Sequence, residues 1–370
     1  MRWLFLTLLV VHGVIHFMGT AKAFGLAELP QLTQPISRGM GVVWLAAGVA
    51  MLWPAAAFLW GPRVWWIIAM GAVFVSQIAI TSAWTDAKFG TLANVIILAG
   101  AVYGFASQGP WSFRAAYERS VEARLSERDL GEPSDLGEAD IAHLPEVVQR
   151  YLRVTGSVGQ PRIDHFRARW RGRIRESPDD AWMTFTAEQV NFIRDPARFF
   201  LMDARRGRLP VDVFHAFANG SASMRVRVLS MFPMVDEQGP ELTRSETVTL
   251  FNDLTLLAPA ALIDPAIEWA AADDRSVRAT YSLGTNTISA VLRFNDAGEL
   301  VDFVSNDRSA TSEGGSSRPL PFSTPVADYA TFGHRRVMTR GEGRWHPPEG
   351  AFAYIELELV GFEVNGRGVR

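Results

Sequence analysis

Cysteine is absent from this chain of 370 residues, which excludes disulfides, thiolate nucleophiles and cysteine-ligated zinc or iron–sulfur centres. Lysine is nearly absent too, since only Lys22 and Lys88 stand among 36 basic residues. The net charge of −3 provides no bulk attraction to nucleic acid, so we expect no nucleic-acid partner. No Walker loop, Gly-x-Ser-x-Gly elbow, His-Glu-x-x-His pair or dinucleotide fingerprint occurs. No motif therefore predicts an enzyme, and catalytic residues stay unknown.

Charge is missing from four long apolar stretches in the first third of the chain. Each has about the length that an α-helix needs to cross a bilayer, where the backbone must satisfy its own hydrogen bonds. We therefore expect four transmembrane helices. The uncharged stretches are Trp3–Ala21, Gly39–Pro62, Val64–Thr85 and Phe89–Phe113.

The basic residues between these stretches indicate an orientation, because cytoplasmic loops carry an excess of Lys and Arg. With the N-terminus inside, Lys22, Arg38 and Lys88 fall outside. The basic residues on the cytoplasmic side are then Arg2, Arg63, Arg114, Arg119 and Arg124. This count favours a four-span protein of the bacterial cytoplasmic (inner) membrane with its C-terminal domain in the cytoplasm.

His12 and His16 are the ionisable side chains of the first stretch. They are four residues apart, so they share one face of a helix. Ionisable groups inside a membrane indicate function by default, and these two could ligate haem or a metal, carry protons or bind a quinone. The alternative is that two neutral imidazoles hydrogen-bond to other helices and fix their packing. Polar residues that could join them are Ser76 and Gln77, and Lys22, Asp86 and Lys88 at one mouth of the bundle. We predict no metal and no cofactor, with haem or quinone as the alternative.

A Gly-x-x-Lys step from Gly19 to Lys22 leaves the first helix. Together with the four helices, this step resembles the DoxX-like membrane proteins. The resemblance implies a four-helix bundle, and some members of that group are linked to quinone redox chemistry.

Composition changes after the fourth stretch. Apolar residues from Phe113 to Leu125 recur at i,i+4 spacing, which predicts a short amphipathic helix. Ser126–Asp140 is rich in Glu, Asp, Gly and Pro, which predicts a flexible tether. The expected domains are a four-helix transmembrane module at 1–107, a juxtamembrane helix and linker at 108–140, and a soluble antiparallel β domain at 141–370.

Short runs of alternating apolar and polar residues in the last domain predict hairpin-linked strands, and Asn219-Gly220 is the strongest turn signal. A helix is expected between Pro145 and Gly156. Another is expected from Thr243 to Leu257, with Thr243 as N-cap and Glu246 closing a capping box. Capping explains why a glutamate stands at position 246, so no catalytic role is needed to explain it. The fold class is therefore α+β.

Arginine occupies every second position on one face of the first predicted strand, at Arg167, Arg169, Arg171, Arg173 and Arg175. Five like charges in a row repel one another unless an anion lies across them. Glu356 and Glu358 on the last predicted strand, Phe352–Val364, are one candidate, and an anionic lipid surface is the other. We favour an ion-paired or solvated strand face. Asp307 and Arg308 are likewise interpreted as a local ion pair.

Several segments between about residues 141 and 365 resemble a bacterial domain-of-unknown-function family. They are Ala181–Gln189, Ile267-Glu268-Trp269, Val291–Phe294, Asp307-Arg308, and the ending with Trp345 and Tyr354. This resemblance implies no catalytic role. The order of elements also resembles the LolA/LppX lipoprotein and lipid carriers, which implies an antiparallel half-barrel, or curved sheet, around a helix and an apolar cavity.

Such a cavity would be lined by one face of the helix, with Val248, Phe251 and Leu254, and by Met231 and Met234, whose flexible side chains suit varied apolar ligands. The predicted function is an integral membrane protein whose β domain binds a lipid or another apolar small molecule near the bilayer. One alternative is a redox component that uses His12 and His16. Another is a structural partner in a membrane complex.

Overall fold

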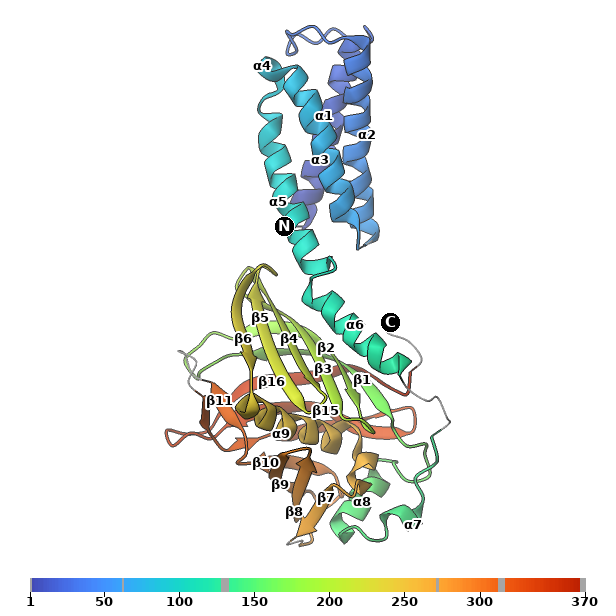
Figure 1. Cartoon of the computed structure of the whole chain (residues 1–370), viewed down its shortest axis with the longest axis vertical. Coiled ribbons are helices and arrows are strands. Elements are labelled where there is room, and N and C mark those ends of the chain that lie inside the picture. The colour runs from blue at the N-terminus through green and yellow to red at the C-terminus, as the bar shows by residue number, and fades with distance from the viewer. Residues whose placement is uncertain (1, 62, 128–132, 271–272, 312–316, 367–370) are drawn as a thin grey trace. The chain divides into compact units, whose positions relative to one another are not determined.

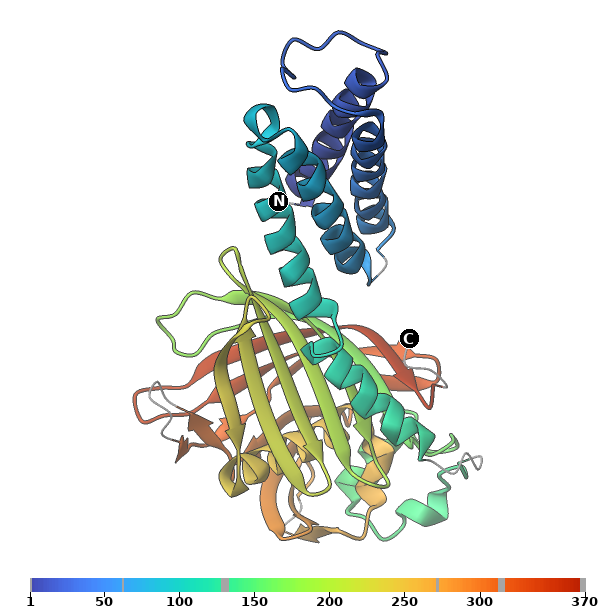
Figure 2. The same cartoon turned by 45° about the horizontal axis from the view of Figure 1, so that its top comes forward.

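The computed structural model describes residues 2–61, 63–127, 133–270, 273–311 and 317–366. The chain divides into two compact units, a helical one within residues 1–116 and a β unit that begins at Tyr117. Figures 1 and 2 show the helices of the first unit and the strongly curved sheet of the second. The expected α+β fold class is confirmed.

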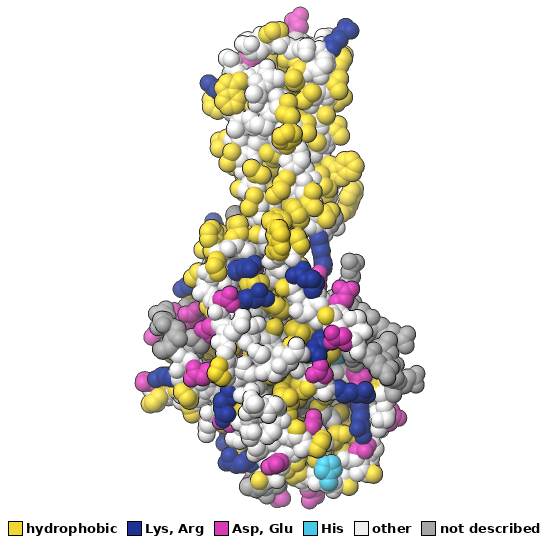
Figure 3. All heavy atoms as spheres, in the orientation of Figure 1, with side chains coloured by type: hydrophobic (Ala, Val, Ile, Leu, Met, Phe, Trp, Pro, Cys, Tyr) yellow, Lys and Arg dark blue, Asp and Glu magenta, His cyan; other side chains and the backbone are white. Residues whose placement is uncertain are grey.

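Four helices of the first unit coincide with the four apolar stretches: α1 (Arg2–Ala23), α2 (Arg38–Trp60), α3 (Trp65–Ser82) and α5 (Gly90–Gln108). A single turn, α4 (Trp84–Ala87), follows α3. All four long helices have the length and apolar composition that crossing a membrane requires. Their outward side chains are hydrophobic, and the face seen in Figure 3 carries almost no charge between its ends. Exposed apolar surface on this scale indicates association with a membrane.

The predicted amphipathic helix is present as α6 (Phe113–Ser126). Tyr117 and Val121 on its apolar stripe are buried, and the Tyr117 ring packs edge-on against Phe214 at 6.4 Å between centroids. Near its end Arg124 pairs with Asp195 and donates a hydrogen bond of 2.6 Å to Asn219 Oδ1. The last two turns of α6 are thus fixed to the β unit.

The β unit is organised around one fourteen-stranded antiparallel sheet, whose main path runs in the order β6-β5-β4-β3-β2-β1-β16-β15-β13-β10-β9-β8-β7, with β14 paired to β15. One arm holds β1 (His165–Ile174), β2 (Met183–Phe192), β3 (Ala197–Arg206), β4 (Leu209–Ala218), β5 (Ser221–Val228) and β6 (Phe232–Gln238). The other holds β7 (Ile267–Ala270), β8 (Ser276–Leu283), β9 (Asn286–Phe294), β10 (Leu300–Ser305), β13 (Phe322–Ser323), β14 (Val326–Phe332), β15 (Arg335–Trp345) and β16 (Phe352–Val364). A separate pair joins β11 (Ser309–Thr311) to β12 (Ser317–Pro319). The Asn219-Gly220 turn links β4 to β5 with positive φ at both residues, as predicted.

Pairing of β1 with β16 joins the two arms. Arg171 forms two hydrogen bonds with Glu358, and Arg173 forms two with Glu356, all between 2.6 and 3.0 Å. Arg175 instead donates to the Ala353 and Pro178 carbonyls. The prediction that these glutamates face the arginine row is confirmed, and they neutralise part of it within the sheet.

Helix α9 (Pro240–Leu257) lies inside the curve of the sheet, where it contacts β5 and β6 of one arm and β9, β10 and β15 of the other (Figure 1). The predicted capping box is wrong. The helix begins at Pro240, since proline favours the first helical position and Gly239 supplies the preceding φ of 124°. Thr243 is already inside the helix and donates to the Gly239 carbonyl. Glu246 is therefore free of any capping role.

Two short helices, α7 (Glu138–Ile141) and α8 (Glu146–Val154), and the 3₁₀ helix η1 (Pro259–Ile263) complete the β unit. Helix α8 ends before Gly156, whose φ is 66°, as predicted. The Tyr151 hydroxyl of α8 donates to the Thr255 carbonyl of α9 at 2.7 Å. This bond ties the two helices together in the core.

Part of the segment expected to be a flexible tether is packed. Residues 128–132 lie outside the described residues, but Leu136 is fully buried and its N–H donates to the Gln160 carbonyl at 3.0 Å. Ile141 belongs to the same hydrophobic core. An isolated apolar residue in a polar segment gives little sequence signal, yet here it anchors the chain to the β unit.

We expect Leu136→Ala to lower the free energy of unfolding of the β unit by about 2–5 kcal/mol, because it removes a fully buried side chain and leaves a cavity. The measurement is the urea midpoint of the purified full-length protein in detergent. Leu209→Ala, at a side chain that is 50% exposed, is the matched control and should change the midpoint little. Equal midpoints for the two variants would show that the segment around Leu136 does not belong to the folded unit.

Candidate functional site

A cavity of about 470 Å³ lies between α9 and the inner face of the curved sheet. Its volume falls within the range of small-molecule binding sites. Much of its wall is apolar and comes from both arms and from α9, with Trp170, Phe200, Met202, Met224, Leu256, Phe322, Met338, Trp345 and Leu357. One charged cluster interrupts this wall.

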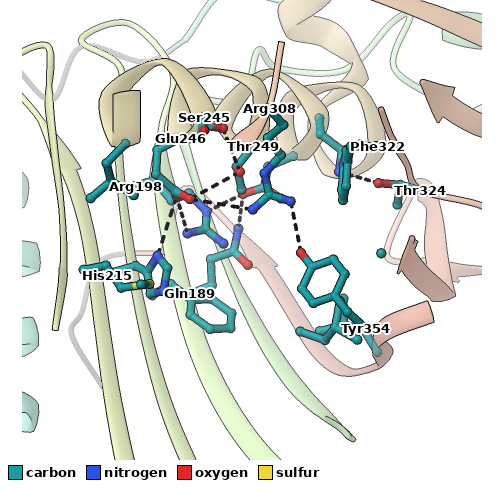
Figure 4. Close-up of a pocket in the computed structure, with 18 of the residues that line it drawn as sticks. Gln189, Arg198, His215, Ser245, Glu246, Thr249, Arg308, Phe322, Thr324 and Tyr354 are labelled. Atoms are coloured by element: carbon teal, nitrogen blue, oxygen red, sulfur yellow. Dashed lines mark hydrogen bonds and ion pairs between the residues drawn. The ribbon is translucent and has the colours of Figure 1, made fainter. Parts of the chain in front are cut away.

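The cluster contains Asp253 together with Arg198, His215, Glu246 and Arg308, and Figure 4 labels the last four. Glu246, Thr249 and Asp253 project from one side of α9, because they are three and four residues apart. Arg198 of β3 donates from Nε to Asp253 Oδ2 at 2.7 Å, and its Nη1 lies 3.5 Å from Glu246 Oε2. Strands β3 and β4, which carry Arg198 and His215, and helix α9 thus bring together charged residues that are far apart in the sequence.

Asp253 is the tightly bound carboxylate of the cluster. Its Oδ2 accepts from Gln189 at 2.6 Å, from Asn191 at 3.2 Å and from Arg198. Burial raises the pKa of Asp253 above its ordinary value, and Arg198 opposes this shift. Three N–H donors on one oxygen favour the ionised form.

Glu246 is buried but loosely held. Its nearest side-chain groups are Arg198 and Thr249 at 3.5 Å, followed by His215 Nδ1 and Arg308 Nη2 at 3.8 Å. Burial alone would raise its pKa, but His215, Arg198 and Arg308 together lower the pKa of Glu246 to about 2. The carboxylate is ionised at neutral pH and keeps unused acceptor capacity.

Arg308, like His215, points toward Glu246 (Figure 4). Its Nη1 donates to the Tyr354 hydroxyl at 3.0 Å, and its guanidinium stacks over Phe322 at 4.4 Å. The predicted local ion pair with Asp307 is wrong, because Asp307 pairs with Arg244 at 2.5 Å and accepts from the Ser289 N–H. Neighbouring residues on an extended segment point to opposite sides, which turns Arg308 inward.

The residues predicted to line a cavity lie elsewhere. Val248 and Phe251 are in the hydrophobic core, where Phe251 stacks on Tyr281 at 5.0 Å. Leu254 is buried beside them on the helix, whereas Met231 and Met234 are 39% and 66% exposed. None of the five lines the cavity, although Met224 of the same methionine-rich region does. The polar side of α9 faces the cavity because the sheet encloses the helix.

Ser323, at the end of β13, and His346, directly after β15, lie side by side, although no sequence pattern connects them. Ser323 Oγ lies 2.7 Å from His346 Nε2. Ser323 is only 2% exposed, and it does not line the cavity, although its neighbours Phe322 and Thr324 do. A nucleophile must reach its substrate, so this pair is explained as a buried hydrogen bond.

His12 and His16 belong to a polar network inside the helical unit. His16 Nδ1 donates to the His12 carbonyl at 2.9 Å, so its Nε2 accepts from the Ser76 hydroxyl at 2.9 Å. His12 Nε2 then donates to Asn94 Oδ1 at 2.9 Å, and Asn94 donates to Gln77 Oε1 at 3.0 Å. These hydrogen bonds connect three helices, α1, α3 and α5. This is the packing role that the sequence offered as the alternative to a cofactor site.

The residues predicted at one mouth of the bundle are only partly connected. Asp86 accepts from the Thr33 hydroxyl and from the Gln34 N–H at 2.6 and 2.7 Å, and these bonds lower its pKa. Lys22 donates to the Leu32 carbonyl, and Lys88 lies over the Phe89 ring at 5.5 Å. Asp86 and Lys22 therefore hold the α1–α2 loop. Within the described residues no group of three or more His, Cys, Asp or Glu side chains is placed to hold a metal ion.

The architecture places the chain in a class of α+β proteins. In this class an antiparallel sheet curves around one helix, and here four apolar helices precede the sheet in the sequence. The chain belongs to a family of unknown function, DUF6544, whose family model matches residues 134–357. This confirms the resemblance to a domain-of-unknown-function family. No curated protein matches the chain.

Solved structures with a similar course of the chain include an outer membrane lipoprotein-sorting protein domain from Vibrio parahaemolyticus, at 9% identity and a TM-score of 0.36, covering 61% of this chain and 93% of that chain. A LolA superfamily protein from Nitrosomonas europaea has 12% identity and a TM-score of 0.33, covering 59% and 94%. A DUF1329 family protein from Desulfovibrio piger has 10% identity and a TM-score of 0.35, covering 63% and 94%. At these TM-scores the likeness says nothing about what this chain binds.

We expect Glu246→Gln to remove part of the acid sensitivity of the β unit. The pKa of Glu246 is lower in the folded protein than its ordinary value of 4.5, so its ionised form stabilises the fold above about pH 4.5. That contribution is lost as the pH falls towards 2, and it amounts to roughly 3 kcal/mol. The variant should be less stable at neutral pH, since it removes the negative charge that faces Arg198 and Arg308, but its stability should fall less between pH 5 and about 3.

The measurement is the urea midpoint of the full-length protein at these pH values. Glu349→Gln, at an exposed carboxylate between β15 and β16, is the control and should keep the wild-type pH dependence. An unchanged pH dependence in Glu246→Gln would show that Glu246 is not the stabilising ionised group.

We expect Ser76→Ala to destabilise the helical unit by roughly 1–2 kcal/mol, because Ser76 is buried and its hydroxyl bonds to His16 and lies within 3.2 Å of His12. Thermal loss of helical circular dichroism in detergent is the measurement. Thr81→Ala on the same helix is the control, since the exposed Thr81 hydroxyl bonds only to the Gln77 carbonyl of its own helix. Equal stability of the two variants would contradict a packing role for the network.

Proposed function

We propose that this protein is a membrane-anchored binding protein whose β unit holds a lipid or another apolar molecule in the cavity beside α9. The main support for this proposal is the cavity, which combines a volume of about 470 Å³ with a largely apolar wall and a few convergent polar groups. This combination is typical of sites for small apolar or amphiphilic ligands. The flexible side chains of Met202, Met224 and Met338 in the wall can adapt to chains of different shape.

Four apolar helices support the membrane part of the proposal. An apolar ligand is scarce in water and abundant in a bilayer, so a binding unit gains access to it by being held at the membrane. We place the protein in a bacterial cytoplasmic membrane with the β unit in the cytoplasm, on the distribution of basic residues between the helices.

The redox alternative rests on His12 and His16 as ligands of haem or a quinone. Ring nitrogens of both residues already take part in hydrogen bonds with Ser76, Asn94 and the backbone. A cofactor would have to replace bonds that join three helices, so the geometry favours the packing role over the redox role. A role as a structural partner in a complex has no specific observation in its favour.

The test is Met224→Trp, which should project a larger side chain into the cavity and displace its ligand. Met234→Trp is the matched control, because Met234 lies on the neighbouring strand and is 66% exposed. Full-length proteins are purified in detergent, and bound molecules are counted by native mass spectrometry and identified after denaturation. We expect one apolar molecule with the wild-type protein and Met234→Trp, and its loss with Met224→Trp. Equal occupancy in both variants would place the ligand outside the cavity, and a ligand-free wild-type protein would contradict the proposal.

A further inference from the structure

The charged cluster limits the kind of polar head that a ligand in this cavity can carry. Arg198 and Arg308 supply two positive charges, and Glu246 and Asp253 supply two negative charges. A net charge brought into a buried, balanced cluster would leave one ion without a partner, which is costly in a poorly solvated site. Balance therefore favours an uncharged head.

The same cluster offers hydrogen-bonding atoms that the protein leaves unused. In the part of the chain that the structure describes, Glu246 has no side-chain donor closer than 3.5 Å. Among the described residues, His215 Nδ1 is buried and has no hydrogen-bond partner, and His215 lines the cavity. Buried polar groups are normally satisfied, so a donor for Glu246 and an acceptor for His215 or Arg308 are called for at this end of the cavity.

A hydroxyl group meets both requirements, because it donates one hydrogen bond and accepts others without carrying charge. A carboxylate or phosphate only accepts and would lie against Glu246, while an ammonium only donates and would lie against Arg198 and Arg308. Glu237 and Glu241 also line the cavity, but they are more exposed than the cluster and solvent screens their charge.

We infer that the cavity selects an amphiphile with a neutral, hydroxyl-bearing head, the class of long-chain alcohols and glycerides, over fatty acids and amines of the same chain length. The hydroxyl lies between Glu246, which accepts from it, and Arg308, which donates to it. The apolar chain extends along the wall formed by Trp170, Trp345 and Leu357. This inference rests on the proposed binding function and specifies its ligand.

The experiment offers the full-length protein in detergent an equimolar mixture of 1-hexadecanol, palmitate and hexadecylamine at about pH 8. Native mass spectrometry measures which probe is retained. We expect the wild-type protein to retain the alcohol at least about tenfold over either ion.

Two substitutions should redirect this preference in opposite directions. Glu246→Gln leaves the cluster with one excess positive charge and should shift retention towards palmitate by about tenfold or more. Arg308→Gln leaves one excess negative charge and should shift retention towards hexadecylamine. The double variant Glu246→Gln/Arg308→Gln restores balance and should again prefer the alcohol, which also guards against the misfolding of a single variant. Glu349→Gln and Arg205→Gln change charge outside the cavity lining and are the controls.

Preferential retention of palmitate or hexadecylamine by the wild-type protein would overturn the inference. So would equal preferences in the wild-type protein and both single variants. Retention of all three probes without discrimination would overturn the head-group inference and leave apolar binding intact. Retention of none, with Met224→Trp indistinguishable from the wild-type protein, would instead contradict the proposed function.

Discussion

A carboxylate inside a protein must be matched by positive charge or hydrogen bonds, and much of the β unit follows from this constraint at Glu246 and Asp253. Both project from a helix that the sheet encloses, so water does not solvate them freely. Arg198 reaches them from one arm of the sheet, and Arg308 reaches Glu246 from the other. Because each arm supplies one cation to the same helix, the curvature of the sheet and the charge of the helix depend on each other.

The same arrangement separates two kinds of interior. Towards β8, β9 and β10, the helix packs through Phe251 against Tyr281 and Phe303 without a gap for a ligand. Towards β3, β4 and β16, its polar side leaves a space that aromatic and methionine side chains complete. Close packing on one side fixes the position of the helix, and that fixed position holds the cavity open on the other.

Local sequence signals were sufficient for most elements. The apolar stretches became helices within a few residues of their predicted ends, and Asn219-Gly220 formed its turn because both residues tolerate positive φ. The site was not predictable by the same reasoning. An apolar stripe normally marks the buried side of a helix, but a helix enclosed by a sheet is buried all round, so Val248 and Phe251 pointed to the wrong side. The partners of Glu246 on other elements, Arg198, His215 and Arg308, lie 31 residues away or more, and no periodic pattern records such long-range pairing.

The predicted capping role of Glu246 failed because of the residues just before it in the sequence. A Thr-x-x-Glu spacing is typical of a capping box, but Pro240 and Gly239 define an earlier start of the helix. Arg308 was assigned to its sequence neighbour, whereas alternation along an extended segment separates the two side chains. In the helical unit, His12 and His16 were recognised, but Asn94 was not connected to them because the pairing of helices is set by tertiary packing.

The pairing of β1 with β16 has a consequence for the order of events during synthesis. The backbone N–H of Asp164, just before β1, donates to the side-chain oxygen of Asn365, so this bond cannot form until a residue 201 positions later has left the ribosome. Until then the arginine row of β1 lacks Glu356 and Glu358, and the two arms cannot be joined. Contacts of such high sequence separation form late and slowly. The apolar helices precede the β unit in the chain, so they are made while the sheet is still open, and the edge of β1 that later pairs with β16 is exposed until then.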